Sequence, residues 1–216
     1  MIESASFQSQ LARRASASGL DLPRTLGEQL EAYFRLLAHW NATINLTALA
    51  LDPISDEALD RLLIEPLSAA RYLAPDMDSW FDLGSGGGSP AIPMKLAKTE
   101  TALTMVESKY RKAAFLREAA RSLGLTRTAV LTERIENVAT NPIYAATADC
   151  VTVRAVRLDS TLLESVGSLL RPHGRALFFG AKLTGPQTLQ GFRLSNELEH
   201  SSSHTDQLLV LDRVSA

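Results

Sequence analysis

A glycine-rich segment carries the clearest chemical pattern in the chain. Residues 79–90 read Ser-Trp-Phe-Asp-Leu-Gly-Ser-Gly-Gly-Gly-Ser-Pro, a short apolar strand followed by glycines and by a proline suited to the first turn of a helix. Because glycine lacks a Cβ atom, it adopts positive φ angles and lets a ligand approach the main chain. The helix that follows directs free N–H groups to the same place. The segment therefore predicts a nucleotide-binding turn.

A second part of the same site follows 23 positions after Gly84. The apolar run 102–106 ends in Glu107, which is spaced like the acid that binds ribose hydroxyls in nucleotide-binding βαβ units. Glu107 also precedes an expected helix, where a carboxylate is stabilised near the N-terminus, and the two roles are compatible. We interpret Asp82, at the end of the first strand, as facing the ligand, with capping of the turn as the alternative.

The composition of the chain limits the class of protein. Its 216 residues, 45% of them hydrophobic, suit one domain with an added element, and the formal charge of −2 and pI near 6.1 exclude an overall basic surface. The first thirty residues hold no sustained apolar stretch, so we expect no signal peptide and a cytoplasmic location. The single cysteine, Cys150, forms no internal disulfide, and four scattered histidines give no zinc spacing, so we expect no metal.

The hydrophobic pattern predicts the elements that position these residues. Apolar spacings of three and four predict helices over 23–40 and 56–72, the second interrupted by Pro66, and so a helical N-terminal region covering 1–75. From 76 to 216 strands and helices alternate, which predicts a parallel sheet with helices on both faces. The expected strands are 79–83, 102–106, 128–132, 149–153 and 174–179, the expected helices are 90–98, 109–123 and 159–171, and 191–198 pairs with 207–212 as a terminal hairpin.

The length of the chain distinguishes between two kinds of nucleotide ligand. A dehydrogenase needs a second mononucleotide-binding half, whereas only about 60 residues follow the strand at 149–153. We therefore expect an S-adenosylmethionine-dependent methyltransferase of class I: a Rossmann-like, mostly parallel seven-stranded α/β sheet with a terminal antiparallel hairpin and an N-terminal helical extension. In that fold Gly84, Gly86 and Gly88 pass under the cofactor. Ile135 and Glu136, after the third strand, contact adenine or simply begin a helix.

The reaction itself leaves few marks in the sequence. Cys150 lies within a strand with no proline before it, unlike the nucleophile that methylates cytosine carbon. The stretch Asn141-Pro142-Ile143-Tyr144 precedes the fourth strand, so it is interpreted as a turn. Arg154 does leave that strand at the ligand edge of the sheet. A ring nitrogen such as guanine N7 bears no proton and needs only alignment, which is consistent with this set of residues.

A basic run departs from the acidic whole. The segment from Lys109 to Arg127 contains six basic residues and a single acid, Glu118. Either this run is a solvated helix face, or its side chains bind phosphates. The RNA-binding candidates here are Arg111, Lys112, Arg117 and Arg121.

Several of these residues together resemble one family. The segments Asn45-Leu-Thr-Ala48, Phe81-Asp-Leu-Gly-Ser-Gly86, Glu107-Ser-Lys-Tyr-Arg-Lys112 and Arg154-Ala155-Val156 are similar to the glucose-inhibited division protein B family, bacterial methyltransferases of guanine N7 in small-subunit ribosomal RNA. The resemblance runs from about residue 25 to Lys182, itself an RNA-binding candidate. It implies an rRNA or 30S-particle substrate. We also expect a monomer. It places Gly84, Ser89, Ile135, Glu136 and Arg154 on S-adenosylmethionine, Glu107 on its ribose, and Asn45 near the target base.

The chain also departs from that family's pattern. Where the family typically reads Arg-His-x-x-Asp-Ser-Leu, residues 61–67 read Arg-Leu-Leu-Ile-Glu-Pro-Leu, and Ser89 replaces a bulky apolar residue. Two alternatives follow from these departures and from the acidic pI. One is a methyltransferase acting on a small molecule, and the other is a non-catalytic module for ribosome assembly or nucleotide sensing.

Overall fold

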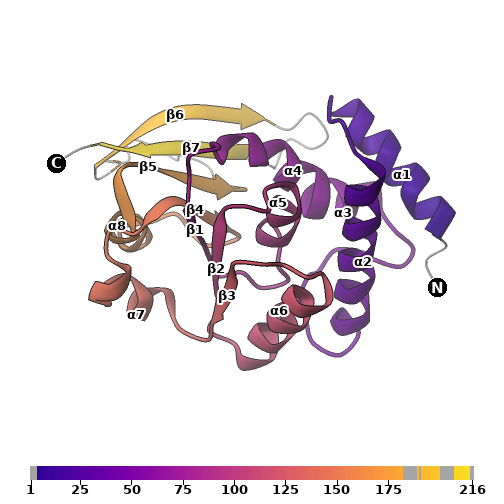
Figure 1. Cartoon of the computed structure of the whole chain (residues 1–216), viewed down its shortest axis with the longest axis horizontal. Helices are drawn as coiled ribbons and strands as arrows, with labels where there is room; N and C mark the ends of the chain where they lie inside the picture. Colours follow the sequence, from indigo (N-terminus) through magenta and orange to yellow (C-terminus); the bar gives the residue numbers. More distant parts are fainter. Residues whose placement is uncertain (1–3, 182–188, 190, 200–206, 215–216) are drawn as a thin grey trace.

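The computed structural model describes residues 4–181, 189, 191–199 and 207–214. Lys182, an RNA-binding candidate, lies outside these residues. Seven strands form one sheet in the order β3-β2-β1-β4-β5-β7-β6, with helices on both faces (Figure 1). The strands are β1 Ser79–Leu83, β2 Ala102–Val106, β3 Thr128–Leu131, β4 Ala148–Arg154, β5 Leu170–Phe179, β6 Phe192–Glu199 and β7 Gln207–Arg213.

The first five strands run parallel, and β7 and β6 close the sheet as an antiparallel pair. The α/β class, the mostly parallel sheet and the terminal hairpin at its edge are therefore confirmed. In β1 and β2 the expected bounds match the observed ones. In β5 they do not, because the strand begins at Leu170, where the backbone already pairs with Ala148.

The helices divide between the two faces. Those on the first face are α1 Ser4–Ala17, α2 Arg24–Asn41, α3 Asp56–Leu59, α4 Glu65–Ala69, α5 Ala91–Ala97 and α6 Tyr110–Ser122, with the π-helical η1 Asp60–Ile64 and the 3-10 η2 Ala70–Tyr72. On the second face lie α7 Ile135–Thr140 and α8 Ser160–Leu169. The 3-10 helix η3 Pro142–Tyr144 follows α7, so the interpretation of 141–144 as a turn holds.

Alternation along the strands builds two hydrophobic cores. Trp80 points into the core shared with the N-terminal helices, whereas the next residue, Phe81, joins the core under α7 and α8. The first core joins buried residues of α1 and α2 directly to strand residues of the sheet. The N-terminal helices are thus packed on the sheet, and the division into two domains near residue 75 stays a prediction.

The run of helix over 56–72 is observed, but its centre differs from an ordinary α-helix. Pro66 falls in the first turn of α4 and is preceded by the π-helical turn of η1. Proline has no N–H and clashes with the preceding turn of an α-helix, so a locally wider turn accommodates it. The chain therefore continues through Pro66 without breaking.

Candidate functional site

The glycine turn after β1 is held by neighbouring strands and by one acid. The N–H groups of Gly84 and Ser85 donate to Val106 O at 2.9 and 3.0 Å, and Gly84 has a φ of +73°. Glu107, at the end of β2, accepts from Gly86 N at 2.9 Å and from Lys109 N at 2.7 Å. Its side chain is thereby fixed between the turn and the start of α6. Glu107 thus binds the N–H of Lys109, the residue before α6, but its side chain does not cap a helical N–H of α6.

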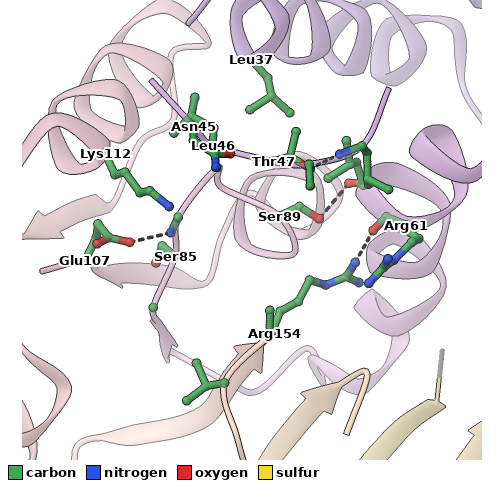
Figure 2. A pocket seen from close by; sticks show the side chains of 18 residues that line it. Leu37, Asn45, Leu46, Thr47, Arg61, Ser85, Ser89, Glu107, Lys112 and Arg154 are labelled. Carbon is green, nitrogen blue, oxygen red and sulfur yellow. Dashed lines mark hydrogen bonds between the residues drawn. The ribbon is translucent and has the colours of Figure 1, made fainter. Parts of the chain in front are cut away.

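Two hollows meet at this turn. The larger, of about 470 Å³, is named here the Arg154 hollow. Its walls come from α2, the segment after it, η1, the glycine turn and the end of β4; the lining residues are Leu37, Asn45, Leu46, Thr47, Ala48, Leu49, Arg61, Leu62, Gly84, Ser85, Gly86, Gly87, Ser89, Glu107, Lys112, Arg154, Ala155 and Val156. Figure 2 shows Glu107 and Lys112 at one end and Arg154 with Arg61 at the other.

The smaller hollow, of about 250 Å³, is named the Ile135 hollow. It is formed by the loops after β2 and β3 and is lined by Gly84, Val106, Glu107, Ser108, Lys109, Glu133, Arg134, Ile135 and Glu136. Gly84 and Glu107 line both hollows. The two cavities are therefore adjoining compartments on either side of one glycine and one carboxylate, at the carboxyl edge of the sheet, where ligands bind in α/β folds.

Most of the expected cofactor residues lie in these walls. Gly84, Gly86, Ser89, Glu107 and Arg154 line the Arg154 hollow, and Ile135 with Glu136 lines the other. Ile135 also begins α7, as one of the two interpretations of this segment expected, and its contact with adenine stays a prediction.

Asp82 and Gly88 line neither hollow. Asp82 is only 1% exposed and accepts a hydrogen bond from Thr152 Oγ1 at 2.6 Å, while Thr152 accepts from Trp80 Nε1 at 2.9 Å. Burial raises the pKa of Asp82 to about 6, against the opposing effect of hydrogen bonds from Ser85 and Thr152. In this arrangement Asp82 supports the sheet behind the turn.

Arg154 is anchored on three sides. Its guanidinium donates to Arg61 O and to Glu65 Oε2, the latter at 2.9 Å, and it lies 4.6 Å from the centre of the Phe179 ring. The side chains of Arg154 and Glu65 are 13% and 6% exposed. These contacts hold the Arg154 side chain at the cavity wall. Loss of Glu65 would leave the buried charge of Arg154 without its partner.

The N-terminal region contributes walls that the sequence patterns did not identify. Tyr33 of α2, fully buried, donates to Gly87 O at 2.7 Å, and a Cβ atom at Gly87 would lie 3.2 Å from Leu37 Cδ1 and from Leu46 O. Only Asn45 was expected from this region, and it does line the Arg154 hollow. Tyr33 and Leu37 had no local signal, because their contacts with Gly87 span about fifty positions of sequence.

The basic run divides into two groups. Lys112 lines the Arg154 hollow and Arg111 is exposed beside it in sequence. Arg117 instead donates to Val130 O and Thr132 Oγ1, and Arg121 pairs with Glu118 at 2.8 Å. The structure thus brings Lys112 to the cavity, while the side chains of Arg117 and Arg121 are engaged by their own chain.

The thiol of Cys150 lies outside both hollows. Cys150 is fully buried in β4, and burial raises the pKa of its thiol. In the described part of the chain, no group of three His, Cys, Asp or Glu side chains is placed to hold a metal ion. No described helix is long and apolar enough to cross a membrane.

Comparisons with known proteins identify relatives of this chain and other proteins with its fold. A relative from Roseiflexus sp. (strain RS-1), named Ribosomal RNA small subunit methyltransferase G, is 38% identical over 169 residues, which cover 77% of this chain and 70% of the relative. A relative of the same name from Neisseria meningitidis is 34% identical, covering 74% of this chain and 72% of its own. An S-adenosylmethionine-dependent methyltransferase from Aquifex aeolicus has the same fold, with a TM-score of 0.56 at 13% identity over 73% of this chain and 93% of that one.

The family model described as GidB, rRNA small subunit methyltransferase G, matches residues 26–203. This range includes the glycine turn, Glu107, Arg154 and the walls of both hollows. The chain therefore belongs to the GidB family of small-subunit rRNA methyltransferases.

Proposed function

We propose that this protein transfers the methyl group of S-adenosylmethionine to N7 of a guanine in 16S rRNA. Membership of the GidB family makes it an S-adenosylmethionine-dependent rRNA methyltransferase, which favours RNA over a small-molecule substrate and catalysis over a purely structural role. The specific choice of guanine N7 rests on the chemistry of the walls. The observation that carries the proposal is the meeting of two compartments at Gly84 and Glu107.

The residues present fit the cofactor. A half-buried apolar side chain, Ile135, faces the smaller compartment and suits a flat adenine ring, with Glu136 at the ring edge. Glu107 would accept the ribose hydroxyls, because its two oxygens are oriented by Gly86 N–H and Lys109 N–H and each retains acceptor capacity. The glycine turn and Ser89 would border the amino-acid part. When bound, the cofactor supplies a methyl group carried on a positively charged sulfur.

The remaining walls suit a nucleophile that bears no proton. Among the described residues lining the Arg154 hollow, Glu107 is the sole carboxylate, and neither histidine nor cysteine is present. With Glu107 assigned to the ribose, no side chain there is left to remove a proton from an amine. Guanine N7 needs no such base, since alignment alone can supply about 7–11 kcal/mol of the barrier in favourable cases.

Positioning of the base would fall to residues on the RNA side of the hollow. Asn45 lies in the segment after α2, which Asn41 holds through hydrogen bonds from Leu46 N at 2.8 Å and Thr47 N at 3.0 Å. Lys112 and Arg111 would bind phosphates, and because the site is a cavity the target base must be unstacked to enter it. A small-subunit rRNA substrate would place the protein in the cytoplasm.

Two measurements test this proposal. Calorimetry with S-adenosylhomocysteine should show one binding site, and absence of binding at millimolar ligand would refute the assigned cofactor site. Transfer of a labelled methyl group to 30S subunits and to free 16S rRNA, followed by nucleoside mass spectrometry, should yield 7-methylguanosine. A different methylated nucleoside would refute the N7 assignment while leaving the rRNA methyltransferase intact.

A further inference from the structure

The turn that contains Pro66 leaves two neighbouring carbonyls without their helical donors. In an α-helix the carbonyl of Arg61 accepts from the N–H of residue 65, and the carbonyl of Leu62 accepts from residue 66. Here the N–H of Glu65 donates to Asp60 O across the wider π-turn, and Pro66 has no N–H. Neither α-helical donor therefore reaches its carbonyl.

Two side chains from the cofactor side take the place of those donors. Arg154 Nη1 donates to Arg61 O, and Ser89 Oγ donates to Leu62 O at 3.0 Å (Figure 2). Both side chains line the Arg154 hollow, one at the end of β4 and one after the glycine turn. Leu62 is largely buried, so removal of the Ser89 hydroxyl would take a hydrogen-bond donor away from its carbonyl.

We propose that Pro66 is a positioning residue of the cofactor site. By withholding an N–H it keeps the Leu62 carbonyl available to Ser89, and the π-turn beside it keeps the Arg61 carbonyl available to Arg154. These bonds join helix, glycine turn and strand around one cavity wall. The inference rests on the proposed function, because it assigns the Arg154 hollow to the cofactor.

The test replaces the missing donor. In Pro66→Ala the new N–H can close an α-turn on Leu62 and release Ser89, so the Kd for S-adenosylhomocysteine should rise about fivefold, the size of one hydrogen bond. The melting temperature should stay unchanged or increase, because a proline leaves the helix. A merely structural proline would not show weaker binding together with undiminished stability.

A double-variant cycle identifies the exchange of donors. Ser89→Ala alone should weaken binding to a similar extent and lower the melting temperature, since Leu62 O loses its donor. Adding Pro66→Ala should restore the melting temperature, because the introduced alanine supplies a backbone N–H, without weakening binding further. Pro142→Ala, at the start of η3 and outside both hollows, is the matched control and should leave both quantities unchanged.

The outcomes separate this inference from the function beneath it. If wild-type protein binds S-adenosylhomocysteine but Pro66→Ala binds it within twofold of wild type, the positioning role is wrong. It is also wrong if the double variant melts no higher than Ser89→Ala. If wild-type protein itself binds no S-adenosylhomocysteine, the proposed function fails first. Should Pro66→Ala fail to fold, the role assigned to Pro66 is refuted, because the variant was expected to be at least as stable.

Discussion

The two hollows share Gly84 and Glu107 but are built in different ways. The Ile135 hollow is formed by two loops that each follow a strand directly, so its walls lie within short stretches of sequence. The Arg154 hollow draws on α2, the segment 45–49, η1, the glycine turn, Glu107, α6 and the end of β4. One compartment is thus a property of the sheet edge, and the other depends on how the N-terminal helices pack.

This difference suggests a division of labour. A site made from loops after parallel strands is common to nucleotide-binding α/β proteins, which suits the adenosine part of a cofactor. Walls supplied by the N-terminal segments are added to this common sheet edge, which would suit the RNA substrate. We therefore expect changes at Glu107 to affect both compartments, and changes at residues of one compartment to leave the other intact.

The largest expected effect is at the carboxylate common to both hollows. Glu107→Ala removes the acceptor of two backbone N–H groups and the proposed ribose ligand, so binding of S-adenosylhomocysteine should weaken about 100-fold, as for loss of charge-assisted hydrogen bonds. Glu136→Ala, which affects the Ile135 hollow alone, should weaken binding about fivefold. Calorimetry measures both, and equal losses would show that Glu107 is not the shared centre.

The next effect concerns the stability of the turn between the hollows. Gly88 has a φ of +85°, and a Cβ atom there would lie 2.5 Å from Ile92 Cδ1 and 3.1 Å from Ile92 Cγ1. Gly88→Ala should lower the free energy of unfolding by about 3 kcal/mol, from backbone strain plus overpacking.

Gly124→Ala is the matched control for that variant, because Gly124 also has a positive φ, of +63°, but meets no atom within 4 Å. Its cost should be the strain alone, about 1 kcal/mol. Urea titrations of the two variants give the difference. If Gly124→Ala lost as much stability as Gly88→Ala, packing against Ile92 would not explain the instability of Gly88→Ala.

A smaller effect depends on pH. The pKa of Asp82 is raised to about 6 in the folded protein, so its protonated form is favoured by folding. Its contribution to stability is present below about pH 4 and is lost as the pH rises through 6, by about 1 kcal/mol between pH 5 and 7. Asp82→Asn should flatten this part of the stability curve, and denaturant titrations at pH 5 and 7 measure it. If the pH dependence of stability were unchanged in Asp82→Asn, another group would be the one that titrates between pH 5 and 7.

The smallest effect distinguishes the two groups of basic residues. Lys112→Glu changes a wall of the Arg154 hollow, so the slope of log affinity for rRNA against log salt should fall by about 0.7, the loss of one phosphate contact. Arg121→Glu alters a side chain already paired with Glu118 and should leave the slope nearly unchanged. Anisotropy titrations over a range of salt compare them. If Arg121→Glu instead changed the slope more than Lys112→Glu, RNA would bind nearer to Arg121 than to the Arg154 hollow.

The sequence predicted the elements around the turn well, for a physical reason. Strand β1, the glycine turn and Glu107 are read from patterns of a few residues, and hydrophobic alternation marks the strands on both sides. Parallel strands then bring their carboxyl ends to one edge, so Glu107 and Ile135 become neighbours by topology alone. The sequence pattern was interpreted as placing Asp82 against the ligand, but Asp82 lines neither hollow. The direction of its side chain depends on its contact with Thr152 and on burial, which a local pattern does not show.

By itself, then, the amino-acid sequence determined the α/β class, the glycine turn, Glu107 and the loops of the Ile135 hollow, because each is encoded by local spacing. Only the tertiary structure decided which residues of α2 and η1 join the expected ones around the Arg154 hollow, and which groups Arg154 contacts. The sequence marks Pro66 and Ser89 as unrelated departures from a family pattern. In the fold one withholds a hydrogen bond that the other supplies to Leu62 O, and a contact between segments so far apart leaves no local pattern to read.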